Sequence, residues 1–307
     1  MSAVDSVLLV AFGGPTAPAE IRPFLEIVTR GRRIPPERLE EVARHYEQMP
    51  GGRSPLNELT ERQAAGARRE LERHGVRVPV FVGMRNWHPF LHETLAAMAA
   101  AGHRRTAAIV LSPFRCEASW DRYLDDVAEA RARVPGAPAV RFTPPWAAQP
   151  GFAAAAADRV RTALADVPAA ERADTPVVFT AHSIPTAMAA AAPYVDEFTA
   201  AARAVAGRAG CARWSLAYQS RSGRPGEPWL EPDIGDVVRG LAADGVRRAV
   251  VMPLGFVCDH VEVLYDLDVE ARALAARSGL GFHRAAAVND HPEFVAMLAE
   301  LAVGACD

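Results

Sequence analysis

The clearest indication of architecture is the segment Val177-Val-Phe-Thr-Ala-His182-Ser-Ile-Pro185, which joins a short apolar run to a turn. The same pattern occurs near the start of the chain as Val7-Leu-Leu-Val-Ala-Phe12-Gly-Gly-Pro15. A second and longer match aligns residues 105–126 with 247–268 without gaps, and it places Cys116 on Cys258. Two matches in the same order predict a chain built from two similar halves.

Short apolar runs alternate with segments of helical period on both sides of these matches. We expect strands at 6–12, 80–84, 107–111, 177–180, 214–217 and 249–252, and helices at 60–74, 91–101, 121–133, 152–164 and 195–208. Apolar strands separated by helices indicate parallel βαβ units whose sheets are covered on both faces. The sequence therefore predicts an α/β fold of two Rossmann-like lobes, each a parallel sheet flanked by helices, related by a pseudo-twofold with a cleft between them.

The domain boundaries follow from the repeat and from a proline-rich stretch at 143–150. We expect an N-terminal lobe over 1–148 and a C-terminal lobe over 149–285 that carries the chemistry. The last segment, 286–307, reads as a helix that packs back on the first lobe. Ligands of such sheets bind beyond the carboxyl ends of the strands, so the residues that follow each strand are the candidates for a site.

Composition excludes several other classes of protein. With 34 basic and 37 acidic residues the net charge is −3, which gives no general attraction for nucleic acid. The N-terminus lacks a basic leader and no apolar run reaches the length of a membrane span, so we expect a cytoplasmic protein without stable membrane insertion. The cysteines are widely scattered and form no CxxC pair, which argues against a zinc site or a disulfide framework: Cys116, Cys211, Cys258 and Cys306.

The two halves differ at the positions where chemistry is expected. The first half has Phe12 where the second has His182, and Trp120 where the second has Glu262. One lobe thus offers aromatic surface and the other a pair that can accept protons and bind a borderline metal such as Fe²⁺. The ordinary alternative for His182 is a buried histidine that is hydrogen-bonded at a turn.

Acidic residues continue beyond Glu262. If residues 259–270 are helical, Glu262, Asp266 and Glu270 lie on one face over roughly 12 Å. Such a row is either a solvated acidic face or a series of oxygen ligands that leads a divalent cation toward the pair. We assign Asp259 and His260, which precede the row, no more than a supporting or structural role.

A Gly/Pro-rich loop follows the strand expected at 214–217. Its Trp229, with Arg221 and Arg224, suits either a plain connector or a stacking surface with cations for carboxylates. In the first half, 28–33 and 45–55 bring cations and small residues together, but they lack the glycine spacing of nucleotide-binding loops.

Taken together, these motifs resemble the signature segments of ferrochelatases, in the same order and over essentially the whole chain. The segments are FTAHSIP, YQSRSG, PWLEPD and PLGFVCDHVEVLYDLDVEA in the second half, and AFGGP, TRGR, PGGRSPLNELT and RNWHPFL in the first. The resemblance is strongest to actinobacterial members of the family.

The resemblance implies insertion of ferrous iron into a porphyrin with release of two protons, in haem biosynthesis and without an organic cofactor. His182 and Glu262 match the metal-insertion pair of the family, and Asp266 and Glu270 match its outer acidic row. The remaining matched positions line the porphyrin or contact its propionates: Phe12, Arg30, Tyr46, Ser54, Tyr123 and Trp229. We expect a monomer or weak dimer.

Two departures from the family pattern matter. Some members have a tyrosine at the position of Phe12 that ligates the product iron, and phenylalanine cannot do so. Others hold a [2Fe–2S] cluster through clustered C-terminal cysteines, whereas this chain has only Cys306 near its end, so we expect no cluster. The actinobacterial resemblance favours coproporphyrin III as substrate, with protoporphyrin IX next. The extra propionates would need cations such as Arg30, Arg32, Arg53, Arg221 and Arg224.

Three other functions fit parts of the pattern. Chelatases that insert cobalt or iron into sirohydrochlorin tend to be shorter or to use two histidines at the metal, where this chain has His182 and Glu262. A non-catalytic tetrapyrrole carrier would bind the ring without turnover. A nucleotide-binding Rossmann protein is disfavoured by the missing glycine fingerprint.

Overall fold

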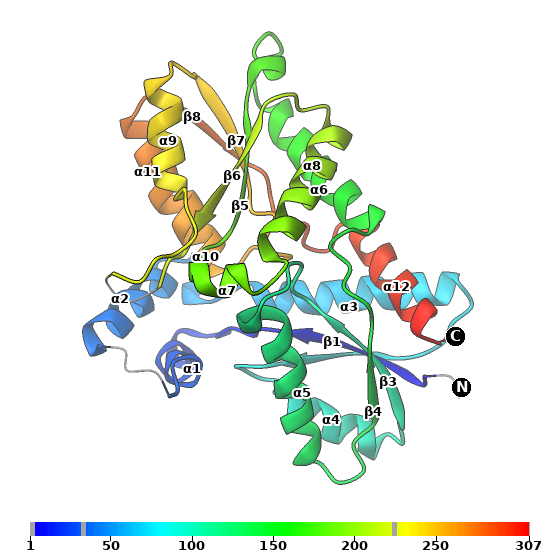
Figure 1. Cartoon of the computed structure of the whole chain (residues 1–307). Helices are drawn as coiled ribbons and strands as arrows, with labels where there is room; N and C mark the ends of the chain where they lie inside the picture. Colours follow the sequence, from blue (N-terminus) through cyan, green and yellow to red (C-terminus); the bar gives the residue numbers. More distant parts are fainter. Residues whose placement is uncertain (1–3, 32–34, 223–225, 307) are drawn as a thin grey trace. The chain divides into compact units, whose positions relative to one another are not determined.

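The computed structural model describes residues 4–31, 35–222 and 226–306, and it divides into two compact units (Figure 1). The first unit comprises Met1–Leu111, Asp121–Pro144 and Val295–Asp307. The second comprises Ser112–Trp120 and Pro145–Phe294. The segment Ser112–Trp120, which the sequence assigns to the first lobe, therefore belongs to the second unit.

The first unit contains a four-stranded parallel sheet in the order β2-β1-β3-β4. Its strands are β1 (Ser6–Ala11), β2 (Val80–Met84), β3 (Arg105–Val110) and β4 (Ala139–Phe142). Its helices are α1 (Ile21–Val28), α2 (Pro36–Glu47), α3 (Leu56–Arg73), α4 (Leu91–Ala100) and α5 (Arg122–Ala132), with short 3₁₀ turns at Pro18–Glu20 and Pro50–Gly52.

The second unit repeats this topology, with a four-stranded parallel sheet in the order β6-β5-β7-β8. The strands are β5 (Val177–His182), β6 (Trp214–Gln219), β7 (Arg248–Met252) and β8 (Gly281–Arg284). The helices are α6 (Pro150–Ala165), α7 (Thr186–Ala190), α8 (Tyr194–Ala209), α9 (Ile234–Ala243), α10 (Val261–Val263) and α11 (Arg272–Arg277), with a 3₁₀ turn at Arg172–Asp174. The predicted α/β fold of two parallel sheets flanked by helices is confirmed.

Two segments are π-helices, η3 (Glu117–Asp121) and η5 (Leu264–Ala271). A π-helix joins residues i and i+5 and so holds more residues per turn than an α-helix. The acidic row beyond Glu262 therefore lies mostly on a π-helix. The α-helical spacing assumed from the sequence was wrong in this detail.

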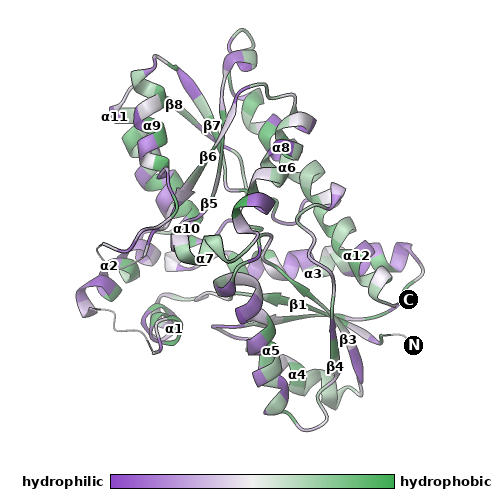
Figure 2. Cartoon of the chain, in the orientation of Figure 1, coloured by the Kyte–Doolittle hydropathy of each residue, from purple (hydrophilic) through white to green (hydrophobic). Residues whose placement is uncertain are grey.

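Burial explains why the central strands form. Every residue of β1 is buried, and so are the first five residues of β5. Figure 2 shows hydrophobic colour along these strands and hydrophilic stretches along outer helices such as α2 and α5. A strand that is apolar on both faces is stable only between two helical layers.

The last helix, α12 (Pro292–Cys306), begins in the second unit, and its residues from Val295 onward belong to the first. A β-carbon on Gly66 of α3 would lie 2.9 Å from Val295 Cγ1, so the absence of a side chain there allows the two helices to pack closely. Arg141 of β4 donates to the carbonyl of Ala305 at 3.1 Å.

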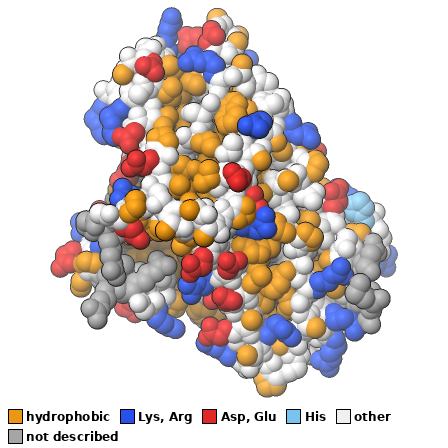
Figure 3. Space-filling model, in the orientation of Figure 1, with side chains coloured by type: hydrophobic (Ala, Val, Ile, Leu, Met, Phe, Trp, Pro, Cys, Tyr) orange, Lys and Arg blue, Asp and Glu red, His pale blue; other side chains and the backbone are white. Residues whose placement is uncertain are grey.

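In the described part of the chain no helix is long and apolar enough to cross a membrane. On the face drawn in Figure 3, basic side chains lie among acidic, hydrophobic and neutral ones.

Candidate active site

The second unit places His182 at the carboxyl end of β5, in register with Gln219 at the end of β6. Because the strands are parallel, both residues lie at the edge of the sheet where the following loops begin. Glu262 reaches the same region from α10, which follows β7. Neighbouring strand ends thus assemble this group.

His182 and Glu262 form the pair that the sequence predicts. His182 Nε2 lies 4.0 Å from Glu262 Oε2, and their side chains are 31% and 49% exposed. His182 Nδ1 is within hydrogen-bond distance of the Ser183 carbonyl, which can only accept, so Nδ1 carries the proton. In the neutral ring Nε2 then has a free lone pair on the side of Glu262, where it can accept a proton or bind a cation.

Aromatic rings border the pair within the second unit. The rings of Trp229 and Phe256 each lie 6.5 Å from the His182 ring, measured between centroids. Phe256 also contacts His260 edge-on at 4.7 Å, and burial lowers the pKa of His260. The partly exposed imidazole of His182 therefore lies near two aromatic rings, a setting that suits a flat hydrophobic ligand.

Within the acidic row, the protein raises the pKa of Asp266 far above its ordinary value. Burial is the main cause that raises its pKa to about 7, and the nearby carboxylates of Glu262, Glu270 and Asp233 act in the same direction. The Ser220 hydroxyl donates to Asp266 Oδ2 and partly opposes the shift. Asp266 can thus hold or release a proton near neutral pH, while Glu270 lies exposed further along η5.

Ser220 has a backbone φ of +63°, a left-handed conformation that costs a non-glycine residue energy. It directly follows β6, and its hydroxyl meets Asp266. Strained backbone conformations of this kind are found frequently at active sites.

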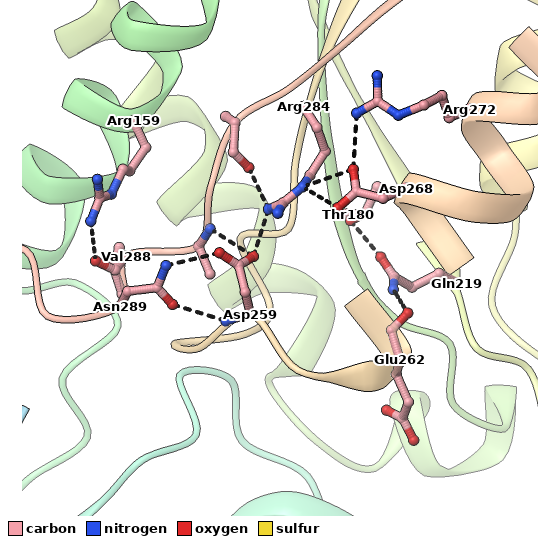
Figure 4. Close-up of polar contacts among 12 residues, drawn as sticks. Arg159, Thr180, Gln219, Asp259, Glu262, Asp268, Arg272, Arg284, Val288 and Asn289 are labelled. Carbon is pink, nitrogen blue, oxygen red and sulfur yellow. Dashed lines mark hydrogen bonds and ion pairs between the residues drawn. The ribbon is translucent and has the colours of Figure 1, made fainter. Parts of the chain in front are cut away.

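The Asp259 side chain forms an ion pair and hydrogen bonds with neighbouring residues of the second unit (Figure 4). Arg284 pairs with Asp259 at 2.5 Å and with Asp268 at 3.0 Å, and Asn289 donates to Asp259 at 2.8 Å. The Arg284 side chain is 12% exposed. This network ties the loop before α10 to η5, and in Figure 4 the Glu262 carboxylate points away from it.

The first unit holds the aromatic positions of the repeat. Phe12, directly after β1, is 38% exposed and lies edge-on to Phe24 at 6.5 Å. Tyr46 contacts the same Phe24 ring at 5.9 Å. The Arg85 guanidinium lies 5.8 Å from the Phe12 ring and 4.3 Å from the Tyr123 ring, and it pairs with Asp126 at 2.5 Å. Phe24 and Arg85 thus link three of the predicted porphyrin positions.

The other predicted positions in this unit differ in exposure. Ser54 is buried, and a β-carbon on Gly14 would lie 2.9 Å from its own, so the two backbones approach closely there. Arg30 and Arg53 are exposed, as is Arg221 in the second unit. Arg32 and Arg224 lie outside the described residues.

Sequence reasoning missed several residues of the site. Gln219 ends β6 and Ser220 follows it, and in the first unit Arg85 follows β2, so the search at strand ends that named His182 would also have found these residues. Phe256 lies within the segment PLGFVCDHVEVLYDLDVEA, but nothing in its sequence position distinguishes it from an ordinary core residue. Among the described residues, no group of three or more His, Cys, Asp or Glu side chains is arranged to hold a metal ion. Cys116 and Cys258 are both buried.

A model of the family described as ferrochelatase matches residues 4–305 of the chain. A protein of Rhodopirellula baltica named ferrochelatase is 42% identical over 299 residues, covering 97% of this chain and 85% of that protein. One of Mycolicibacterium smegmatis named coproporphyrin III ferrochelatase is 43% identical over 301 residues, covering 97% of this chain and 88% of its own length.

Among solved structures, the cobalt complex of the sirohydrochlorin chelatase SirB from Bacillus subtilis subspecies spizizenii matches with a TM-score of 0.58. The match covers 98% of this chain and 94% of that one, at 12% identity. At this identity the similarity shows the chelatase-like fold alone.

Proposed function

Because the chain belongs to the ferrochelatase family, we propose that it inserts ferrous iron into coproporphyrin III, with His182 and Glu262 as the residues that carry out the insertion. The observation that carries the proposal is the position of His182 Nε2 4.0 Å from Glu262 Oε2 at the end of β5. An imidazole and a carboxylate at this separation can attract a divalent cation and accept protons beside it.

The chemistry requires two protons to leave the ring nitrogens as the metal enters. His182 suits the first acceptor, because its hydrogen bond to Ser183 leaves Nε2 available. Glu262, half-exposed, supplies the negative charge that draws the cation. Asp266 has a pKa of about 7, so it exchanges protons near neutral pH and suits the next site along the acidic row. Glu270, exposed beyond it, continues the row toward solvent.

We assign porphyrin contacts to the aromatic and polar positions of the repeat. Trp229 and Phe256 border His182 and suit the ring faces, as do Phe12, Tyr46 and Tyr123 of the first unit. Ser54 and Arg30 suit the polar edge. Substrate binding that distorts the ring out of planarity would use remote contacts of this kind to expose its nitrogens.

Coproporphyrin III has four propionates where protoporphyrin IX has two, and it therefore needs more cations. Arg30, Arg53 and Arg221 are exposed and suit this need. Relatives named coproporphyrin III ferrochelatases support the same choice. The cytoplasmic location, the monomeric or weakly dimeric state and the absence of an iron–sulfur cluster stay predictions.

Anaerobic steady-state assays with Fe²⁺ and each porphyrin test the substrate assignment. We expect kcat/KM for coproporphyrin III to exceed that for protoporphyrin IX at least tenfold. A preference for protoporphyrin IX would overturn the coproporphyrin assignment and leave the chelatase activity standing. Failure to metallate either porphyrin would overturn both.

A further inference from the structure

The main-chain carbonyl groups of His182 and Glu262 are both held by buried side chains. The Tyr194 hydroxyl donates to the carbonyl of His182 at 2.9 Å, and Gln219 Nε2 donates to that of Glu262 at 3.4 Å. Tyr194 is 5% exposed and Gln219 is 1% exposed. Neither residue is needed for the proton and metal chemistry described above.

The orientation of Gln219 follows from its partners. Because the Glu262 carbonyl can only accept, the amide must present its NH₂ group there and its oxygen to the other side. On that side the Thr180 hydroxyl donates to Gln219 Oε1 at 2.7 Å. Figure 4 shows Thr180, Gln219 and the Glu262 main chain as one line of hydrogen bonds, with the Glu262 carboxylate pointing away from it. The line connects β5 and β6 to the helix that carries Glu262.

Packing contacts hold the side chain of Tyr194 in place. It is the first residue of α8, and its ring lies edge-on to Phe114 at 5.9 Å. Phe114 also packs on Phe198 at 5.3 Å. The adjacent Arg115 forms a close ion pair with Glu197 of α8. Burial raises the pKa of Tyr194 well above its usual value, so the hydroxyl keeps the proton that it donates.

We propose that Tyr194 and Gln219 are positioning residues that fix the separation of His182 and Glu262 by holding their main-chain carbonyls. This inference rests on the proposed function of the pair. The two donors approach from different elements, α8 and β6, so each limits a movement that the other does not. Loss of either one leaves a carbonyl without that partner and allows His182 or Glu262 to shift relative to the other.

Two conservative variants test the inference. Tyr194→Phe removes one hydroxyl and keeps the ring, and Gln219→Met removes the amide and keeps a similar length. Each should lower kcat about three- to tenfold, as expected for one neutral hydrogen bond, and raise KM for Fe²⁺ while KM for porphyrin stays unchanged. Thr180→Val, which removes the donor to Gln219, should show the same pattern more weakly. Thr94→Val is the matched control, because Thr94 is a buried threonine that donates to the Val82 carbonyl of the first unit.

Epistasis separates positioning from a general loss of stability. In a His182→Ala background, Tyr194→Phe should cause no further loss of Zn²⁺ affinity measured by calorimetry without porphyrin. A further loss equal to that in the wild-type background would overturn the inference. Kinetics that match those of Thr94→Val would also overturn it. If His182→Ala itself keeps full metallation and Zn²⁺ affinity, the proposed pair is wrong and the inference falls with it.

Discussion

The pH dependence of protein stability can test the environment of Asp266 quantitatively. A carboxyl group is ordinarily ionised at pH 6, whereas Asp266 in the folded protein is mostly protonated at that pH. Its pKa is raised from an ordinary 3.8 to about 7, mainly by burial. Between pH 3.8 and about 7, Asp266 keeps its proton in the folded protein but has lost it in the unfolded chain. Stability contributed by the protonated group is therefore lost as the pH rises through about 7. Asp266→Asn removes this dependence.

The expected size follows from the two pKa values. Each pH unit corresponds to 1.36 kcal/mol, so the full cost of ionising Asp266 in the folded protein is at most about 4 kcal/mol. Between pH 5 and pH 8 the free energy of unfolding of Asp266→Asn should gain about 2–3 kcal/mol on that of the wild type. Thermal unfolding followed by circular dichroism at both pH values, in buffer with a chelator, measures this difference.

Asp158→Asn provides a control of opposite sign. A hydrogen bond from His291 lowers the pKa of Asp158, so its ionised form stabilises the protein above its ordinary pKa. That variant should melt below the wild type at pH 8. A raised pKa of Asp266 is ruled out if Asp266→Asn melts no higher than the wild type at pH 8, or if the variant's advantage in melting temperature is the same at pH 5.

Other substitutions test separate parts of the structure. Arg284→Met leaves the carboxylates of Asp259 and Asp268 without their buried partner and should cost about 3–5 kcal/mol in urea denaturation, and a loss below 1 kcal/mol would mean that the network is not structural. Phe12→Tyr introduces a phenol next to the proposed ring site. After the iron-porphyrin product complex is oxidised to the ferric form with ferricyanide, it should show a visible phenolate charge-transfer band, and an unchanged spectrum would place Phe12 away from the iron. Phe24→Leu removes the ring beneath Phe12 and should raise KM for porphyrin several-fold while KM for Fe²⁺ stays the same.

Much of the fold was predictable because the central strands are apolar and the repeat is visible in the sequence. The equal strand orders of the two sheets confirm the repeat. The edge strands β4 and β8 were not predicted. Each has four residues, is only partly buried and carries an arginine, so neither shows an apolar run. The strands at the opposite edges, β2 and β6, are longer and more apolar, and they were predicted.

The site was predictable to the extent that strand ends determine it. His182 was predicted because it follows an expected strand and because the repeat aligns it with Phe12. Glu262 was predicted because the repeat aligns it with Trp120. The π-helix under Asp266 was not predictable, because no local residue pattern distinguishes it from an α-helix here. Tyr194 was also missed, since its contact with the His182 carbonyl depends on how α8 packs and not on sequence spacing.

Single-turnover metallation tests whether His182 and Glu262 insert the metal. Porphyrin is bound first to the wild type, His182→Ala and Glu262→Gln, and anaerobic Fe²⁺ is then mixed in while the absorption of the ring is followed. The exposed pair His74→Ala and Glu72→Gln serves as matched control.

We expect both site variants to bind porphyrin with unchanged Kd and to metallate it at least about 100-fold more slowly, the size typical of a lost acid–base group. The controls should react like the wild type. Metallation at the wild-type rate by either site variant would contradict the assignment, and porphyrin binding without any turnover by the wild type would indicate a carrier in place of an enzyme.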